Sequence, residues 1–285
     1  MLIAESGSTK TVWKLCRDGK ILKTFRTPGF NPNNQEEEDI LEGLKAGFEI
    51  NLSGEKIDEV IFYGAGLGGA SQRAVMDRLL QKALPGTRVM VEHDMLAAAR
   101  STRRQEGIVC ILGTGSNSCY HKDYQIVKSL GGHGYLFGDE GSGADLGRYL
   151  LKGLLQHDYP TKVRTYLEQQ EGNTIYEIKI QVHHADSPNV RMAELAQHIS
   201  PFFDVPEIRE MVTGRMLAFL DTTVCRYENY EQLTVDFVGS IAFFFREFLE
   251  EACRMRAVRI GEIVKDPVDN LVAFHLMGGA QSLTA

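Results

Sequence analysis

The first 30 residues alternate short apolar runs with polar turns. The runs at 2–4, 11–16 and 21–27 have the length of β-strands, and Asp18-Gly19 between the last two is a strong hairpin signal. The turn at 5–10 reads Glu-Ser-Gly-Ser-Thr-Lys and is rich in glycine and hydroxyl groups. The pattern predicts a strand, a Gly/Ser/Thr turn, a second strand, a tight turn and a third strand.

A glycine-rich segment at 107–147 repeats this design. It holds 10 of the 28 glycines and begins with the apolar run 108–112. The loop Gly113-Thr114-Gly115-Ser116 follows, and then come two strand-like stretches at 117–121 and 125–130. A strand that leads back into a strand is not the strand–turn–helix of dinucleotide-binding folds, and the chain has no Gly-x-x-x-x-Gly-Lys-[Ser/Thr] motif.

The two strand–turn–strand units predict an internal structural repeat without obvious sequence identity. Each hydroxyl-rich turn has free N–H groups that suit a phosphate, so the pair would bind one polyphosphate. The alternative is two unrelated hairpins whose turns bind nothing.

Helices and strands alternate through the stretch between these units, which indicates an α/β fold. The expected elements are a helix at 36–48, a strand at 57–63, a helix at 71–83, a strand at 87–92 and a helix at 95–104. Asp94 follows the last of these strands, and ligands of open α/β sheets bind at the carboxyl ends of strands. The alternative is that Asp94 only caps the following helix.

The second half of the chain is mostly helical. Ser142 and Asp145 have capping-box spacing, and two apolar stripes at helical spacing run from Ile208 to Val224 and from Ile241 to Cys253. We expect the phenylalanines of the second stripe to pack in the core. The remaining elements expected are helices at 142–156, 160–170 and 190–199, strands at 233–238 and 258–264, a solvated turn at His183-His184, and either a final turn and helix or an unordered tail at 275–285.

Composition narrows the class of protein. The length of 285 residues suggests one or two domains, and 43% hydrophobic with 24% charged residues is ordinary for a soluble globular protein. A net charge of −7 without a long basic run argues against a nucleic-acid partner, and no apolar stretch has the length of a membrane span. Five scattered cysteines without a Cys-x-x-Cys pair predict reduced thiols in a cytoplasmic protein.

Three motifs together resemble the sugar kinase, heat-shock chaperone and actin superfamily. Residues 5–11 resemble its first phosphate motif, residues 113–117 its second, and Val238-Gly239-Ser240-Ile241 its adenosine motif. Within it the chain is most similar to the BadF/BadG/BcrA/BcrD ATPase family, and Gly138-Asp139-Glu140-Gly141-Ser142 is similar to the signature of its N-acetylglucosamine kinases. The resemblance implies two RNase H-like α/β domains with an interdomain cleft, at 1–104 (with 273–285 returning to it) and at 105–272.

The resemblance also implies how ATP and Mg²⁺ would bind. A carboxylate at Glu5 would hold Mg²⁺ through water, because this ion gives up its waters reluctantly. The residues expected to contact ATP are Gly7, Ser8, Thr9 and Lys10 in the first turn, Thr114, Gly115 and Ser116 in the second, and Gly239 and Ser240 on the adenosine side.

By the same resemblance Asp94 matches a catalytic aspartate that accepts the proton of the sugar hydroxyl as it attacks the γ-phosphoryl group. The residues expected to contact the sugar are Asn33 (or Asn31), Gly132, His133, Gly134 and Asp139. Seen alone, each asparagine is also a turn former and His133 an ordinary loop histidine. The family further implies a homodimer and domain closure on binding.

The function predicted is therefore that of an ATP- and Mg²⁺-dependent kinase for the 6-hydroxyl of N-acetylglucosamine or a related amino sugar. One alternative is the ATPase activator of a radical enzyme, as in the benzoyl-CoA reductase branch of the same family. Such proteins hold an iron–sulfur cluster with paired cysteines, which this sequence lacks. The other alternative is a nucleotide-dependent sugar sensor without catalysis.

Overall fold

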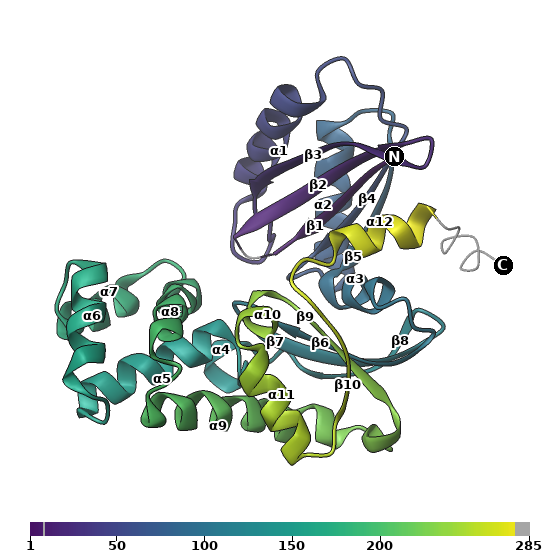
Figure 1. Cartoon of the computed structure of the whole chain (residues 1–285). Coiled ribbons are helices and arrows are strands. Elements are labelled where there is room, and N and C mark those ends of the chain that lie inside the picture. Colours follow the sequence, from purple (N-terminus) through teal and green to yellow (C-terminus); the bar gives the residue numbers. More distant parts are fainter. Residues whose placement is uncertain (8, 277–285) are drawn as a thin grey trace. The chain divides into compact units, whose positions relative to one another are not determined.

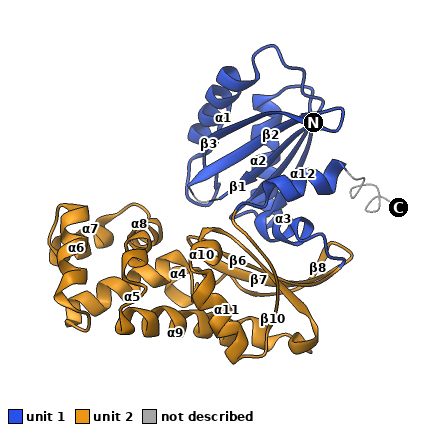
Figure 2. Cartoon of the chain, viewed as in Figure 1, with its two compact units in different colours: residues 1–105, 266–285 blue, residues 106–265 orange. Residues whose placement is uncertain are grey.

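The computed structural model describes residues 1–7 and 9–276 and divides into two compact units (Figures 1 and 2). Unit 1 contains Met1–Gln105 together with the segment that begins at Asp266, and unit 2 is the uninterrupted stretch Glu106–Lys265. Ser8 and residues 277–285 lie outside the described residues. Of the final turn and helix, or tail, expected at 275–285, only 275–276 are described, and they end a helix that begins at Val268. The domain boundaries expected from the sequence stay a prediction.

Unit 1 is built on a five-stranded sheet with the order β3-β2-β1-β4-β5. The first three strands are antiparallel, and β1, β4 and β5 are parallel. The strands are β1 (Leu2–Ser6), β2 (Lys10–Arg17), β3 (Lys20–Pro28), β4 (Glu59–Gly64) and β5 (Arg88–His93), and the helices are α1 (Glu37–Leu52), α2 (Ala70–Ala83), α3 (Asp94–Ser101) and α12 (Val268–Leu276).

The two faces of this sheet bury alternate residues of β1. Leu2 and Ala4 join the core under α1 and α2, where Trp13 packs edge-on against Phe48. Glu5 lies on the other face, which α3 and α12 cover (Figure 1). Glutamate is rarely found on a face covered by helices unless its carboxylate has a partner. The position of Glu5 therefore points to a functional role for its carboxylate rather than to core packing.

Unit 2 repeats the same topology, with the sheet order β10-β9-β6-β7-β8. Again three antiparallel strands come first and two parallel strands complete the sheet, which confirms the predicted structural repeat and the α/β class. The strands are β6 (Glu106–Leu112), β7 (Ser116–Lys122), β8 (Gln125–Gly131), β9 (Thr234–Val238) and β10 (Arg259–Val264).

In unit 2 the helices α10 and α11 pack on the sheet, and the other helices pack mainly on one another. Helix α5 packs against α8, and a methyl group at Gly147 would lie 1.8 Å from the carbonyl oxygen of Met192, so the two backbones touch. The helices are α4 (Gly134–Phe137), α5 (Gly143–Gln156), α6 (Thr161–Glu171), α7 (Ile175–His184), α8 (Pro188–Ala196), α9 (Pro206–Thr222), α10 (Ser240–Phe244) and α11 (Arg246–Met255), with short 3₁₀ turns at Gln197–Phe202, Val224–Arg226 and Tyr230–Gln232.

Two predictions about local structure are wrong. His183 and His184 are exposed as expected, but they form the last turn of α7 rather than an irregular turn. The second apolar stripe is not one helix, because the backbone leaves helical geometry at Phe245, between α10 and α11. This break rotates Phe244 out of the core, so that it is 56% exposed, while Phe248 stays fully buried.

Candidate active site

The carboxyl ends of the parallel strands of unit 1 bring acidic side chains together. Glu5 is the penultimate residue of β1, and Asp94 follows β5 and begins α3. Asp266, just before α12, also lies close enough to act on the charge of Glu5. Glu5 and Asp94 are predicted from the sequence. Asp266 is not, because it belongs to none of the sequence motifs.

Burial and mutual repulsion change the acidity of this cluster. The pKa of Glu5 rises to about 7, first because the carboxyl is desolvated and then because Asp94 and Asp266 repel its charge, with Lys10 opposing. Burial raises the pKa of Asp94 to about 6, although the Met95 N–H donates to its Oδ1 at 2.8 Å. Both carboxyl groups therefore have pKa values near neutral pH, which is the range that suits a general base. A cation bound nearby would favour the ionised form of either group.

The donor set fits a magnesium ion that is held mainly by a phosphate ligand. The described residues contain no group of three or more His, Cys, Asp or Glu that would form a protein-only metal cage. Mg²⁺ in kinases commonly takes one or two carboxylates and completes its shell with water and phosphate oxygens. Glu5, whose ionised form is penalised in the protein alone, would be the carboxylate stabilised by the cation.

The Glu5→Gln variant should unfold with a different pH dependence from the parent protein. The folded state retains a proton on Glu5 between about pH 4.5 and 7, where the unfolded state has lost it, so stability falls as the pH rises through this window. Removing the charge should stabilise the apo protein by on the order of 2 kcal/mol at pH 8 and little at pH 4.5. Urea unfolding in EDTA measures this. The matched change at exposed Glu49 should not show this dependence, and equal effects at both pH values would contradict the assignment.

The β1–β2 turn is closed by a hydrogen bond from the Gly7 N–H to the Lys10 carbonyl at 2.9 Å. Thr9 and Lys10 are exposed at its tip, and Lys10 Nζ lies 3.3 Å from Asp266 Oδ1. The buried hydroxyl of Ser6, which sequence reasoning passed over, accepts from Thr11 at 2.8 Å and from the Phe30 N–H at 3.0 Å. Ser6 thus fixes the predicted phosphate turn to the loop that follows β3.

That loop contains the predicted sugar-contacting asparagines. The Asn33 side-chain amide donates to the Gly66 carbonyl at 2.7 Å and to Asn31 Oδ1 at 3.1 Å. Gly66 has φ +77°, and a methyl group there would lie 2.3 Å from Asn31 Oδ1. Both asparagines are therefore anchored on the turn after β4, and glycine is required at position 66 for this approach.

In unit 2 the second predicted phosphate turn meets the predicted sugar residue Asp139. The Ser116 N–H donates to Asp139 Oδ1 at 3.2 Å, and a methyl group at Gly115 would lie 2.9 Å from Asp139 Oδ2. Burial raises the pKa of Asp139 despite this hydrogen bond. The carbonyl of Thr114 accepts from the Ala144 N–H at 3.1 Å, which ties the turn to the first residues of α5.

The other predicted residues of unit 2 lie around the same turn. The Gly132 N–H donates to the Ser116 carbonyl at 3.3 Å, and His133 and Gly134 follow it as exposed residues. Gly239, with φ +121°, lies so close to the end of β6 that a methyl group would be 2.3 Å from the Leu112 carbonyl oxygen. Ser240 is exposed at the start of α10.

The capping box predicted at Ser142 forms only in part. Ser142 Oγ accepts from the Asp145 N–H at 3.2 Å, as expected. The Asp145 carboxylate instead accepts from the Gly141 N–H at 2.9 Å and pairs with Arg148 and Arg215. The Gly-Asp-Glu-Gly-Ser segment is thereby held between α5 and α9.

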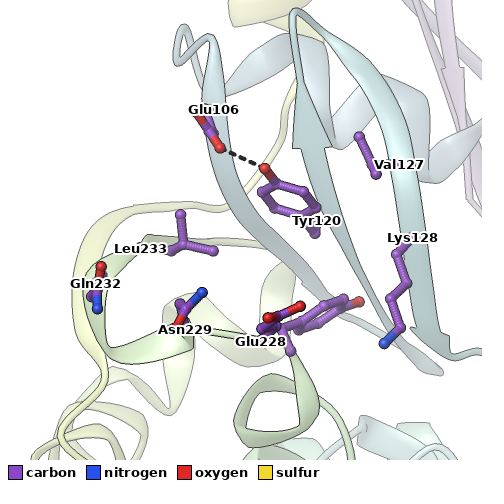
Figure 3. Close-up of a pocket in the computed structure, with 9 residues that line it drawn as sticks. Glu106, Tyr120, Val127, Lys128, Glu228, Asn229, Gln232 and Leu233 are labelled. Carbon is purple, nitrogen blue, oxygen red and sulfur yellow. Dashed lines mark hydrogen bonds between the residues drawn. The ribbon is translucent and has the colours of Figure 1, made fainter.

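A cavity of about 420 Å³ lies elsewhere in unit 2, at the amino end of β6 (Figure 3). Tyr120 donates a hydrogen bond to Glu106 across its rim at 2.5 Å. None of the predicted site residues lines it, and its walls are Glu106, Tyr120, Val127, Lys128, Tyr227, Glu228, Asn229, Gln232 and Leu233. The sequence-derived site and this cavity are therefore separate features.

Within residues 1–7 and 9–276, no helix combines the length and the apolar character that crossing a membrane requires. No family model matches the chain.

Comparison with known proteins gives both family and fold. Over 191 residues the chain is 29% identical to the N-acetylmuramic acid/N-acetylglucosamine kinase of Clostridium acetobutylicum, an alignment that covers 63% of this chain and 60% of that relative's length. The crystal structure of a candidate N-acetylglucosamine kinase from Porphyromonas gingivalis is 35% identical, with a TM-score of 0.92 over 97% of this chain and 99% of that one. A ROK family glucokinase from Streptomyces griseus, solved with glucose and AMPPNP, has the same fold at 15% identity, with a TM-score of 0.57 over 99% of this chain and 98% of that one.

Proposed function

Because the chain belongs to the N-acetylglucosamine kinase-like family within the ROK and actin-like ATPase superfamily, we propose that it transfers the γ-phosphoryl group of ATP to the 6-hydroxyl of N-acetylglucosamine or a related amino sugar. The family confirms the resemblance seen in the sequence. The identity of the sugar, the metal and the homodimer remain parts of the proposal.

The observation that carries the proposal is the position of Asp94. Asp94 is the residue that directly follows a parallel strand, and its side chain is partly buried. Its pKa is raised to about 6, and it lies close enough to Glu5 for the two negative charges to repel each other. A carboxylate with this pKa is mostly ionised at pH 7 and still basic enough to take up a proton as an alcohol attacks phosphorus. In phosphoryl transfer the protein contributes mainly by positioning the two substrates and by stabilising the charge on the phosphoryl group.

The remaining residues take roles that suit their surroundings. Glu5 would hold Mg²⁺, which neutralises phosphate charge when it is bound. The hydroxyl of Thr9, the amine of Lys10 and the turn at Thr114 and Gly115 would contact the phosphates, and Gly239 and Ser240 the adenosine side. Ser116 would support the second turn, because its N–H donates to Asp139 and its hydroxyl to the Glu140 carbonyl. Asn31, Asn33 and Asp139 offer amide and carboxylate groups to sugar hydroxyls, and Gly132, His133 and Gly134 offer exposed backbone beside them.

A coupled assay of ADP release tests the proposal across N-acetylglucosamine, glucosamine, N-acetylmannosamine, N-acetylmuramic acid and glucose. We expect sugar-dependent turnover with at least one N-acetylated amino sugar, and loss of that turnover in EDTA with recovery on adding excess Mg²⁺. NMR of the product should place the phosphate on the 6-oxygen. Sugar binding without any ADP release would favour the sensor, and the absence of both would reject the proposal.

A further inference from the structure

Three buried polar side chains of unit 1 form a chain of hydrogen bonds on the same face of the sheet as Glu5. Arg100 Nη1 on α3 lies 2.8 Å from the Tyr63 hydroxyl on β4, and that hydroxyl lies 2.8 Å from His275 Nε2 on α12. Tyr63 is fully buried, and Arg100 and His275 are 4% and 9% exposed. A single hydroxyl thus joins strand β4 to both helices on this face of the sheet.

The direction of these hydrogen bonds follows from the charges. Burial and the neighbouring Arg100 lower the pKa of His275 to about 4, so its ring is neutral at pH 7. Arg100 can only donate, so Tyr63 accepts from Arg100 and donates to the unprotonated Nε2 of His275. Each of the three groups therefore fixes the orientation of the next.

Burying the guanidinium group of Arg100 carries a free-energy cost, so stability of the fold alone does not explain this arrangement. No carboxylate of the described residues forms an ion pair with Arg100, and within the same part of the chain Arg100 Nε and His275 Nδ1 have no hydrogen-bond partner. A buried cation without a counter-ion costs more than an apolar residue of the same size would. A role beyond stability accounts better for its presence.

The three residues are attached to the elements that carry the acidic cluster. Tyr63 is the register partner of Glu5 in the sheet, and Arg100 belongs to the eight-residue helix that begins at Asp94. Asp266 lies two residues before α12, which holds His275. A direct hydrogen bond of 3.0 Å also joins Arg103, two residues after α3, to Asn270 on α12.

We propose that Arg100, Tyr63 and His275 act as a positioning clamp that sets Asp94 and Asp266 at fixed distances from Glu5. The inference rests on the proposed kinase function for its effect on turnover. The clamp itself touches no substrate. Its loss would let α3 and α12 shift on the sheet, and displacements of about 1 Å at a reacting group lower rates by up to roughly 10²-fold.

The Tyr63→Phe variant tests the clamp, because it removes one oxygen and keeps the ring. We expect kcat to fall about 10- to 100-fold with KM for ATP within about twofold. Hydrogen–deuterium exchange should quicken in 94–101 and 268–276 but not in the strand that contains Tyr63. The matched control is Tyr227→Phe, which removes the buried hydroxyl that bonds Ser118 at 2.9 Å in unit 2 and should change none of these quantities.

A double-mutant cycle adds a second readout. Arg100→Met should lower kcat by a similar factor, Arg100→Lys should restore part of it, and combining Arg100→Met with Tyr63→Phe should cost little more than either alone. The clamp is rejected if kcat of Tyr63→Phe equals that of the parent, if the single losses multiply in the double variant, or if exchange in the two helices is unchanged. A parent protein without kinase activity would reject the proposed function alone, and the exchange experiment would still decide on the clamp.

Discussion

Replacing Asp94 by asparagine should lower kcat by roughly 10²- to 10⁴-fold and leave the affinity for ATP within about twofold. Asparagine keeps the shape and the hydrogen bond that the side chain accepts from the Met95 N–H at 2.8 Å. It has no lone pair basic enough to take the hydroxyl proton, so only the protein's positioning of the two substrates remains. Because the aspartate pKa is already raised by burial, removing the charge should not destabilise the fold at pH 7.

Steady-state kinetics and ATP titration calorimetry measure the two halves of this prediction. Asp58→Asn is a suitable control, since Asp58 is an exposed aspartate of the same unit that pairs with Lys56 at the surface. Thermal unfolding of both variants separates chemistry from stability. If Asp94→Asn phosphorylated sugar at the parent rate, another group would have to be the base.

The second large effect should appear in stability. Gly147→Ala places a methyl group 1.8 Å from the Met192 carbonyl oxygen, where backbone rather than a flexible side chain has to yield. Helices α5 and α8 would have to separate, and we expect a loss of about 3 kcal/mol. For a unit of this size that corresponds to a fall of roughly 6–12 °C in its unfolding temperature.

Gly214→Ala supplies the matched comparison, because Gly214 lies inside α9 and a methyl group there would meet no atom of another segment within 4 Å. There alanine only improves helix propensity, so it should stabilise by about 0.5–1 kcal/mol. Differential scanning calorimetry of both variants gives the sign directly. An unfolding temperature of Gly147→Ala equal to or above that of the parent would show that the contact between α5 and α8 is looser than described.

Much of the fold could be predicted because hydrophobic periodicity and turn chemistry agree locally. Asp18-Gly19 fixed the first hairpin, and the glycine-rich turn after residue 112 fixed the second. Helix α7 was missed because Tyr176 and Ile180 are more than half exposed, which blurs its apolar stripe. Its capping box from Thr174 to Glu177 was the available signal. Phe244 was misplaced because a break of one residue cannot be read from apolar spacing.

The candidate site was predicted only where its residues belong to turns. Gly115 and Asp139 come together because a backbone N–H and a carboxylate meet across a tight corner, and the glycines marked both segments. Tyr63, Arg100 and His275 are spread over more than 200 residues and each resembles an ordinary core or surface residue in sequence. Their association follows from the sheet register and from a helix that comes after all of unit 2, neither of which local patterns contain.

Unit 1 is made from two pieces of chain that are separated by all of unit 2. During synthesis, the ribosome releases every strand of the first sheet long before α12 exists to cover its acidic face. All residues of unit 2 are available for folding once Lys265 has left the ribosome, whereas unit 1 still lacks the segment that begins at Asp266. Nascent chains should therefore acquire a protease-resistant unit 2 first, and the carboxylates around Glu5 should reach their final environment only after that unit has been made.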